Sequence, residues 1–234
     1  GPFQHPEKVV PRFITQALTG APLTIHGDGH ASRDWLYVDD HADAIEANAE
    51  ALVTILSREQ GKPLNGPNAR FEVGACATWL RVTADTPLPV ETIIDDGDTF
   101  AEMHYRPLGT VGAITPWNWP MMIAIWQIAP SLRMGNTVVQ KPSEYTSLSG
   151  LALNFILNTV LPEGVLNTVV GAGDLGARIV ESEKIDKIMF TGSTRTGKRI
   201  VEASSGNLKR LTLELGGNDA GIVLDDVDPK AIAE

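Results

Sequence analysis

Cysteine is scarce in this chain, because Cys76 is the only one among 234 residues. A single thiol excludes an internal disulfide and any metal site built from several thiolates. The five histidines never fall at the His-Glu-x-x-His spacing of zinc enzymes. His26, His30 and His41 form only a loose cluster, which we interpret as loop histidines. We therefore expect no metal centre.

Long apolar runs and basic charge are also lacking. The longest apolar run, 121–128, is interrupted by Gln127 and is far shorter than the roughly 20 residues that span a bilayer. No basic-then-apolar signal pattern opens the chain, so we expect a cytoplasmic protein without a membrane partner. With 19 basic and 29 acidic residues the net charge is −10, which argues against binding to nucleic acid.

The second half of the chain alternates between strand-like and helix-like patterns. We expect strands at 110–115, 136–140, 166–170, 187–191 and 210–215, and helices at 119–134 (broken at Pro130), 147–160, 174–183 and 194–205. This alternation predicts an α/β fold, a doubly wound, Rossmann-like parallel sheet with helices on both faces. Such sheets bind ligands at the carboxyl ends of their strands.

The preceding residues have a different pattern. Apolar residues recur at helical spacing over 41–60, and the following Gly-Lys-Pro ends that helix. A second helix, 70–83, carries Cys76, and nothing nearby in the sequence would lower the pKa of its thiol. We interpret Cys76 as a buried structural residue. The pattern of 93–105 indicates a hairpin around Asp96-Gly97-Asp98.

Two of the expected strand ends carry residues suited to a nucleotide. The strand ending at Thr191 leads through Gly192-Ser193 into a helix, where free amide groups and the helix dipole can hold a pyrophosphate. Alternatively, Ser193 only caps that helix. Lys141 and Glu144 follow another strand and could hold the two hydroxyls of a ribose, or they could form a solvated charge pair.

Two other strand ends carry residues suited to acyl chemistry. Asn118 lies between Pro-Trp and Trp-Pro, and a rigid amide donor of this kind suits the stabilisation of an oxyanion. Its alternative role is to satisfy backbone groups of the turn. Glu214 precedes Leu215-Gly216-Gly217 and could act as a general base, although by itself it is one of many acidic residues.

Four motifs, taken in order, strongly resemble the aldehyde dehydrogenase superfamily. They are Pro-Trp-Asn-Trp-Pro at 116–120, Gly-Asn-Thr-Val-Val-x-Lys-Pro-Ser-Glu at 135–144, Phe-Thr-Gly-Ser-Thr at 190–194 and Leu-Glu-Leu-Gly-Gly-Asn at 213–218. The segments 59–64 and 161–167 resemble the same family. The resemblance covers about residues 46–234 and implies the dinucleotide-binding domain of such an enzyme.

The resemblance implies a role for each matching position. Asn118 would donate to the oxyanion, and Glu214 would be the general base that activates the deacylating water. The cofactor would be NAD, with NADP as the alternative, and an acid at position 144 favours NAD. We assign to the cofactor site the residues of the strand-end loops Trp117, Lys141, Ser143, Glu144, Gly192 and Ser193. Residues 92–106 would form an oligomerisation hairpin.

The nucleophile of this family is a cysteine beyond the general base, and this sequence ends at Glu234 before reaching one. We therefore expect a truncated domain without the catalytic-cysteine domain. Residues 1–45 resemble instead a part of nucleotide-sugar dehydratases of the dTDP-glucose 4,6-dehydratase type, through 1–8, 25–29 and 33–41. Arg33 would then contact nucleotide-sugar phosphates, but the dehydratase cofactor motifs are missing, so we interpret Arg33 as a surface or packing residue.

The sequence thus predicts a chimera of a short α+β segment, 1–45, and a dinucleotide-binding domain, 46–234, joined near 43–48. Our first functional hypothesis is an NAD-binding protein of oxidoreductase ancestry whose oxidation of aldehydes is impaired or lost. The second is a hydrolase of activated esters that uses Ser143 or Ser193 near Glu214. The third is a non-catalytic homo-oligomeric scaffold, because a truncated sheet would expose apolar surface.

Overall fold

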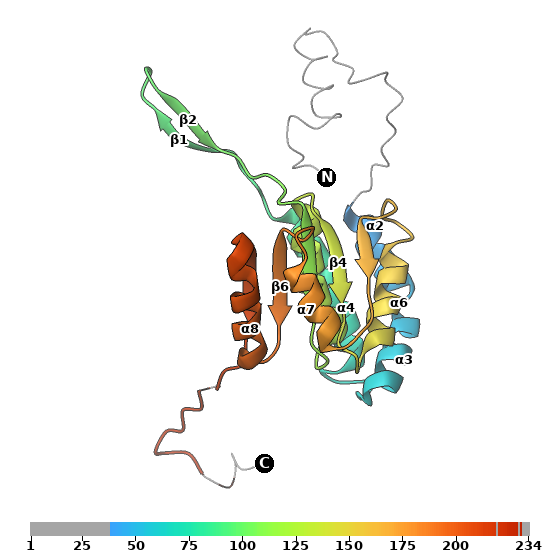
Figure 1. Cartoon of the computed structure of the whole chain (residues 1–234). Coiled ribbons are helices and arrows are strands. Elements are labelled where there is room, and N and C mark those ends of the chain that lie inside the picture. The colour runs from blue at the N-terminus through green and yellow to red at the C-terminus, as the bar shows by residue number, and fades with distance from the viewer. Residues whose placement is uncertain (1–37, 219, 229, 231–234) are drawn as a thin grey trace.

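The computed structural model describes residues 38–218, 220–228 and 230. Most of the predicted segment 1–45, including Arg33, His26 and His30, lies outside these residues. Its last residues belong to helix α2 (Val38–Ala47). The described chain otherwise consists of one α/β body and a projecting hairpin (Figure 1).

The body is built on a five-stranded sheet. Its strands are β3 (Thr110–Ile114), β4 (Thr137–Lys141), β5 (Leu166–Thr168), β6 (Lys187–Thr191) and β7 (Arg210–Glu214). They lie in the order β5-β4-β3-β6-β7, and every neighbouring pair is parallel. This confirms the predicted parallel sheet. The strand order reverses between β3 and β6, which is where doubly wound sheets bind dinucleotides.

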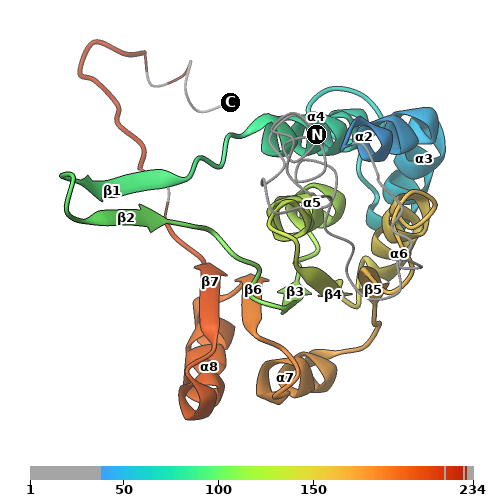
Figure 2. The same cartoon turned by 90° about the horizontal axis from the view of Figure 1, so that it is seen from above.

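Helices cover both faces of the sheet, as predicted. α5 (Pro120–Arg133) and α6 (Ser147–Leu157) lie on one face, and α7 (Gly173–Glu181) and α8 (Thr194–Ser204) lie on the other (Figure 2). The short helix η1 (Ser205–Asn207) follows α8. Helices α2, α3 (Ala49–Gln60) and α4 (Ala69–Asp85) pack against α5 and α6 as an outer layer.

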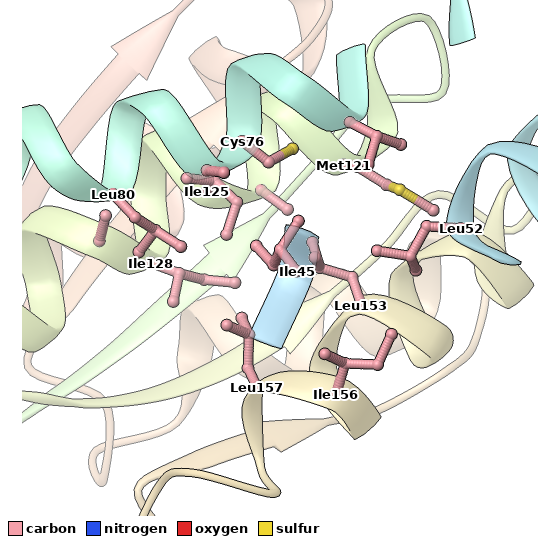
Figure 3. Close-up of a cluster of buried hydrophobic side chains, with 14 of the residues drawn as sticks. Ile45, Leu52, Cys76, Leu80, Met121, Ile125, Ile128, Leu153, Ile156 and Leu157 are labelled. Atoms are coloured by element: carbon pink, nitrogen blue, oxygen red, sulfur yellow. The ribbon is translucent and has the colours of Figure 1, made fainter. Parts of the chain in front are cut away.

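Two apolar cores fill the space on either side of the sheet. The larger core is formed by the five helices α2 through α6 together with one face of the sheet. It includes Leu52, Leu80, Ile125 and Leu153 (Figure 3). The smaller core joins α7 and α8 to the opposite face of the sheet. Within β3, Ala113 belongs to the larger core and the adjacent Ile114 to the smaller one, because successive side chains of a strand point to opposite faces. The sheet is therefore held on both faces.

Two details of the predicted helices are wrong. Helix α5 is not broken at Pro130 but continues to Arg133. The burial of one face of α5 between the sheet and α4 offsets the single hydrogen bond that an internal proline removes. The predicted helix 41–60 is divided into α2 and α3 at Asn48. There the side-chain amide of Asn48 donates to the carbonyl of Ala44 (2.9 Å), and such local bonds compete with a continuous helix.

The predicted hairpin is present as β1 (Glu91–Asp95) and β2 (Phe100–Met103), which pair antiparallel around a turn at Asp96 and Gly97. It extends away from the body (Figure 1). Within the described residues, no helix combines the length and the apolar character needed to cross a membrane.

Candidate functional site

The carboxyl ends of the five strands lie at one edge of the sheet, because all five strands are parallel. The register places Lys141 beside Ile114, and Thr191 beside Glu214. All of the predicted site residues lie at the ends of β4 and β7 or in the loops that follow β3, β4 and β6. Adjacent strands are about 4.8 Å apart, so the ends of β3 and β7, which flank β6, lie roughly 10 Å from each other. The candidate site is this edge.

Lys141 ends β4 with its side chain almost fully buried. Its Nζ atom donates to the carbonyl of Pro142 (2.8 Å) and lies 3.9 Å from Glu144 Oε2, whose side chain is half exposed. Burial lowers the pKa of Lys141 from its ordinary value of 10.5, although the nearby charges of Glu144 and Asp174 act in the opposite direction. The predicted pair is therefore present, with an anchored cation and an accessible carboxylate.

Ser143 shapes the loop between this pair and α6. It is buried, and its Oγ atom accepts a hydrogen bond from the backbone N–H of Tyr145 (3.3 Å). Its carbonyl accepts hydrogen bonds from the backbone N–H of Thr146 (3.1 Å) and the hydroxyl of Ser147 (3.1 Å). The hydroxyl of Ser143 is thus engaged in a turn.

Gly192 and Ser193 connect β6 to α8. The Ser193 side chain caps α8 by accepting from the backbone N–H of Thr196 (3.2 Å), so the capping role is present. Capping does not exclude an anion site, because the remaining amide groups of the first turn stay free to donate. A Cβ atom at Gly192 would lie only 2.5 Å from Cζ of Phe190, so a larger residue here would displace the Phe190 ring or the loop.

Glu214 ends β7 with its side chain exposed. Its carbonyl accepts a hydrogen bond from the backbone N–H of Gly192 (3.0 Å). This bond joins the loop after β7 to the loop after β6, so the predicted base and the predicted anion site belong to one connected piece of backbone.

Asn118 and Trp117 are exposed in the loop between β3 and α5. Among the described residues, the side chain of Asn118 makes no hydrogen bond. Its backbone, in contrast, is tightly held. Gln60 Nε2 donates to the carbonyls of Trp117 (2.6 Å) and Asn118 (2.8 Å), and Lys62 Nζ donates to the carbonyl of Asn118 (2.9 Å).

The residues that hold this loop were not among the predicted site residues. Lys62 Nζ forms an ion pair with Glu72 Oε2 (2.6 Å) and lies 3.9 Å from the centre of the Trp119 ring. Glu72 Oε1 accepts from the backbone N–H groups of Met121 (2.9 Å) and Met122 (3.2 Å), at the start of α5. A carboxylate from α4 therefore supplies the cap that Trp119, the N-cap residue of α5, does not provide.

Glu59 caps the start of α6 in the same way. Its two carboxylate oxygens accept from the backbone N–H groups of Leu148 (2.6 Å) and Ser149 (2.9 Å). Segment 59–62 therefore contacts both the loop of Asn118 and the start of the helix that follows Glu144. Gly61, at φ +73°, makes the turn that separates Gln60 from Lys62. The only sequence signal for this arrangement was the 59–64 motif, whose resemblance implied no contact.

Neither a cluster of potential metal ligands nor a reactive thiol is found in the described part of the chain. No group of three or more potential metal ligands occurs there. Cys76 is fully buried, and burial together with the charge of Glu72 raises the pKa of its thiol well above the ordinary value. This confirms the structural interpretation of Cys76, because only a thiolate is a good nucleophile.

Comparisons with known proteins agree with these features. The aldehyde dehydrogenase family model matches residues 30–234. Phenylacetaldehyde dehydrogenase of Pseudomonas fluorescens is 41% identical over 206 residues, which cover 82% of this chain and 40% of that protein. The solved NAD⁺ complex of an aldehyde dehydrogenase from Bacillus cereus shares 36% identity with a TM-score of 0.77, covering 82% of this chain and 40% of that one.

The family match begins at residue 30, so it includes the last part of the segment 1–45 that we predicted to be dehydratase-like. No comparison supports a dehydratase-like origin for that segment, and the assignment stays a prediction. The chain spans less than half the length of the curated relatives it matches. Family match, fold and motif order nevertheless agree over most of the sequence: this chain belongs to the aldehyde dehydrogenase family.

Proposed function

We propose that these residues form the dinucleotide-binding part of an NAD-dependent oxidoreductase that acts on aldehydes. The observation that carries this proposal is the edge of the sheet at its switch point. There the amino end of α8 and the Lys141–Glu144 pair lie on opposite sides of β3. That arrangement offers one anion site and one hydroxyl-binding site within the span of a single dinucleotide.

The residues present fit NAD. The pyrophosphate would lie at the start of α8, where Gly192 lets it approach the backbone and the exposed Arg195 and Lys198 add positive charge. Lys141 and Glu144 would hold the adenosine ribose, the lysine as donor and the carboxylate as acceptor. The charge of Glu144 would repel the additional phosphate of NADP. When bound, the nicotinamide would accept a hydride from the substrate.

Asn118 and Glu214 would act on the substrate. The Asn118 amide is exposed and is not engaged by other described residues, so it is available to donate to a developing oxyanion. Glu214 is exposed at the end of β7, where its carboxylate can take a proton from water. For the esterase alternative no structural observation was found, since the hydroxyls of Ser143 and Ser193 are engaged in a turn and a helix cap.

Calorimetric titration with NAD and NADP tests the cofactor assignment. We expect the wild-type chain to bind NAD more tightly than NADP, and Glu144→Gln to reduce that preference. Lys184→Met is the matched control, because Lys184 is exposed before β6 and away from the carboxyl edge. Absence of NAD binding at millimolar concentration would refute the proposal.

We also propose that the β1–β2 hairpin mediates self-association. All five residues of β1 are exposed, and Ile93 and Phe100 are 57% and 63% exposed on a two-stranded element that no other described residues cover. An isolated apolar hairpin of this kind is stabilised by packing against another surface. Light scattering should report an oligomer that Ile93→Ser with Phe100→Ser dissociates. A wild-type monomer of 25.2 kDa would contradict it.

A further inference from the structure

The backbone around Asn118 is held on both sides of its Cα atom. The carbonyl of Trp117 belongs to the peptide plane before that atom, and the carbonyl of Asn118 belongs to the plane after it. Gln60 binds both carbonyls, and Lys62 binds the second. Fixing both planes fixes φ and ψ of Asn118, so the direction of its Cα–Cβ bond is set before any ligand arrives.

The ammonium group of Lys62 is itself fixed by its surroundings. The Lys62 side chain is only 11% exposed, and its Nζ atom lies 2.6 Å from Glu72, 2.9 Å from the carbonyl of Asn118 and 3.9 Å from the centre of the Trp119 ring. The Glu72 carboxylate is completely buried, and its other oxygen is bound by the start of α5. A buried ion pair whose remaining polar atoms are all bonded has one geometry, because any displacement leaves a buried group unpaired.

We infer that Lys62, anchored by Glu72, is a positioning residue that aims the side-chain amide of Asn118 at the reacting oxygen of the substrate. Lys62 does not touch the substrate itself. It acts through the carbonyl of Asn118, and Glu72 prevents it from following that carbonyl if the loop moves. This inference rests on the oxyanion role proposed for Asn118 and assigns its geometry to residues in α4 and after α3.

A purely structural pair would not need this arrangement. Glu72 caps α5 through one oxygen, and that contact alone would serve the stability of the helix. Lys62 extends the network past the helix to Asn118, whose side-chain amide is exposed and makes no hydrogen bond among the described residues. The network thus runs from the buried carboxylate of Glu72 through Lys62 to the backbone of Asn118, whose amide faces solvent. This connection is the reason to infer a positioning role.

The first test is independent of activity. The side-chain amide signals of Asn118 in a proton–nitrogen correlation spectrum are assigned by their loss in Asn118→Asp. The double variant Lys62→Met/Glu72→Gln removes both charges without leaving one of them buried alone. We expect the Asn118 signals to shift in this variant, and to stay in place in Lys184→Met. Unchanged Asn118 signals in a folded double variant would overturn the inference.

The second test is a double-variant cycle on aldehyde oxidation, measured in a polypeptide in which this chain is followed by the catalytic-cysteine domain of the family. Lys62→Met/Glu72→Gln should lower kcat by on the order of 100-fold, as expected of a displaced catalytic group, while the Kd for NAD changes by less than about twofold. In an Asn118→Ala background the same changes should have almost no further effect. An equal loss in both backgrounds would show a general structural role and overturn the inference. Loss of NAD binding in the wild type would instead refute the proposed function, and the spectrum would still decide the positioning role.

Discussion

Lys62 and Glu72 lie ten positions apart in the sequence and form an ion pair of 2.6 Å, in which the Glu72 carboxylate is completely buried. The pair joins the segment after α3 to the starting turn of α5. Removing one partner of a buried pair leaves an uncompensated charge, which costs more than the pair contributes in total. Because of this ion pair, we expect Glu72 to be the position where a single substitution lowers the free energy of unfolding most.

We expect Glu72→Gln to lower the free energy of unfolding by about 3 kcal/mol. The amide keeps the shape of the side chain but leaves the charge of Lys62 without its partner. The melting temperature should fall by roughly 6–12 °C, as measured by thermal unfolding. Glu50→Gln is the control, because Glu50 is 75% exposed in its pair with Arg70, and it should change stability by less than about 1 kcal/mol. Equal effects of the two changes would contradict the assigned burial.

Gly192→Ala should destabilise the protein and weaken NAD binding together. The added Cβ atom would lie 2.5 Å from the Phe190 ring, so either the ring or the loop must move. We expect a loss of about 1–3 kcal/mol in stability, measured by urea unfolding, and a higher Kd for NAD by calorimetry. Gly206→Ala is the control, because nothing lies within 4 Å of an added Cβ atom there. A silent Gly192→Ala would show that the loop has more room than the structure gives it.

Stability should depend on pH through Lys141. Burial lowers its pKa in the folded protein below the ordinary value of 10.5. Between the folded-state pKa and that value, the unfolded chain binds more protons than the folded chain, so the free energy of unfolding rises with pH. Lys187 and Lys209, whose pKa values burial also lowers, contribute in the same direction.

The variant Lys141→Met should therefore show a weaker rise in stability with pH across this alkaline window than the wild type. Urea unfolding at a series of pH values measures both slopes. Lys184→Met serves again as the control and should keep the wild-type slope. If Lys141→Met keeps the wild-type slope too, the pKa of Lys141 in the folded protein is not lowered, which contradicts the prediction.

Leu208→Asn should stabilise the protein. Leu208 is 88% exposed and has φ +52°, the only non-glycine residue of the described chain with positive φ. Leucine is strained in this region, whereas asparagine tolerates it. We expect a gain of about 0.5–1 kcal/mol, measured by urea unfolding. Leu64→Asn, at an exposed position without positive φ, should give no such gain.

Local patterns predicted the parts of the structure that depend on nearby residues. The apolar run before Gly192 and the capping side chain of Ser193 predicted the end of β6 and the start of α8, and both are present. Pro130 shows the limit of such reasoning. Its missing N–H is a local signal for a break, but packing of the surrounding helix against distant elements keeps α5 continuous.

By itself, the sequence determined the alternation of strands and helices and therefore a parallel sheet, whose strand ends bring Asn118, Lys141, Ser193 and Glu214 to one edge. This follows because strand direction in such a sheet depends only on the intervening helices. Only the tertiary structure decided how that edge is held. The side chains of Gln60, Lys62 and Glu72 bind backbone groups 49–58 positions away in the sequence. A periodic pattern of apolar residues cannot predict a contact between a side chain and a distant backbone carbonyl or amide. These contacts form only when the apolar faces of α3, α4 and α5 pack together.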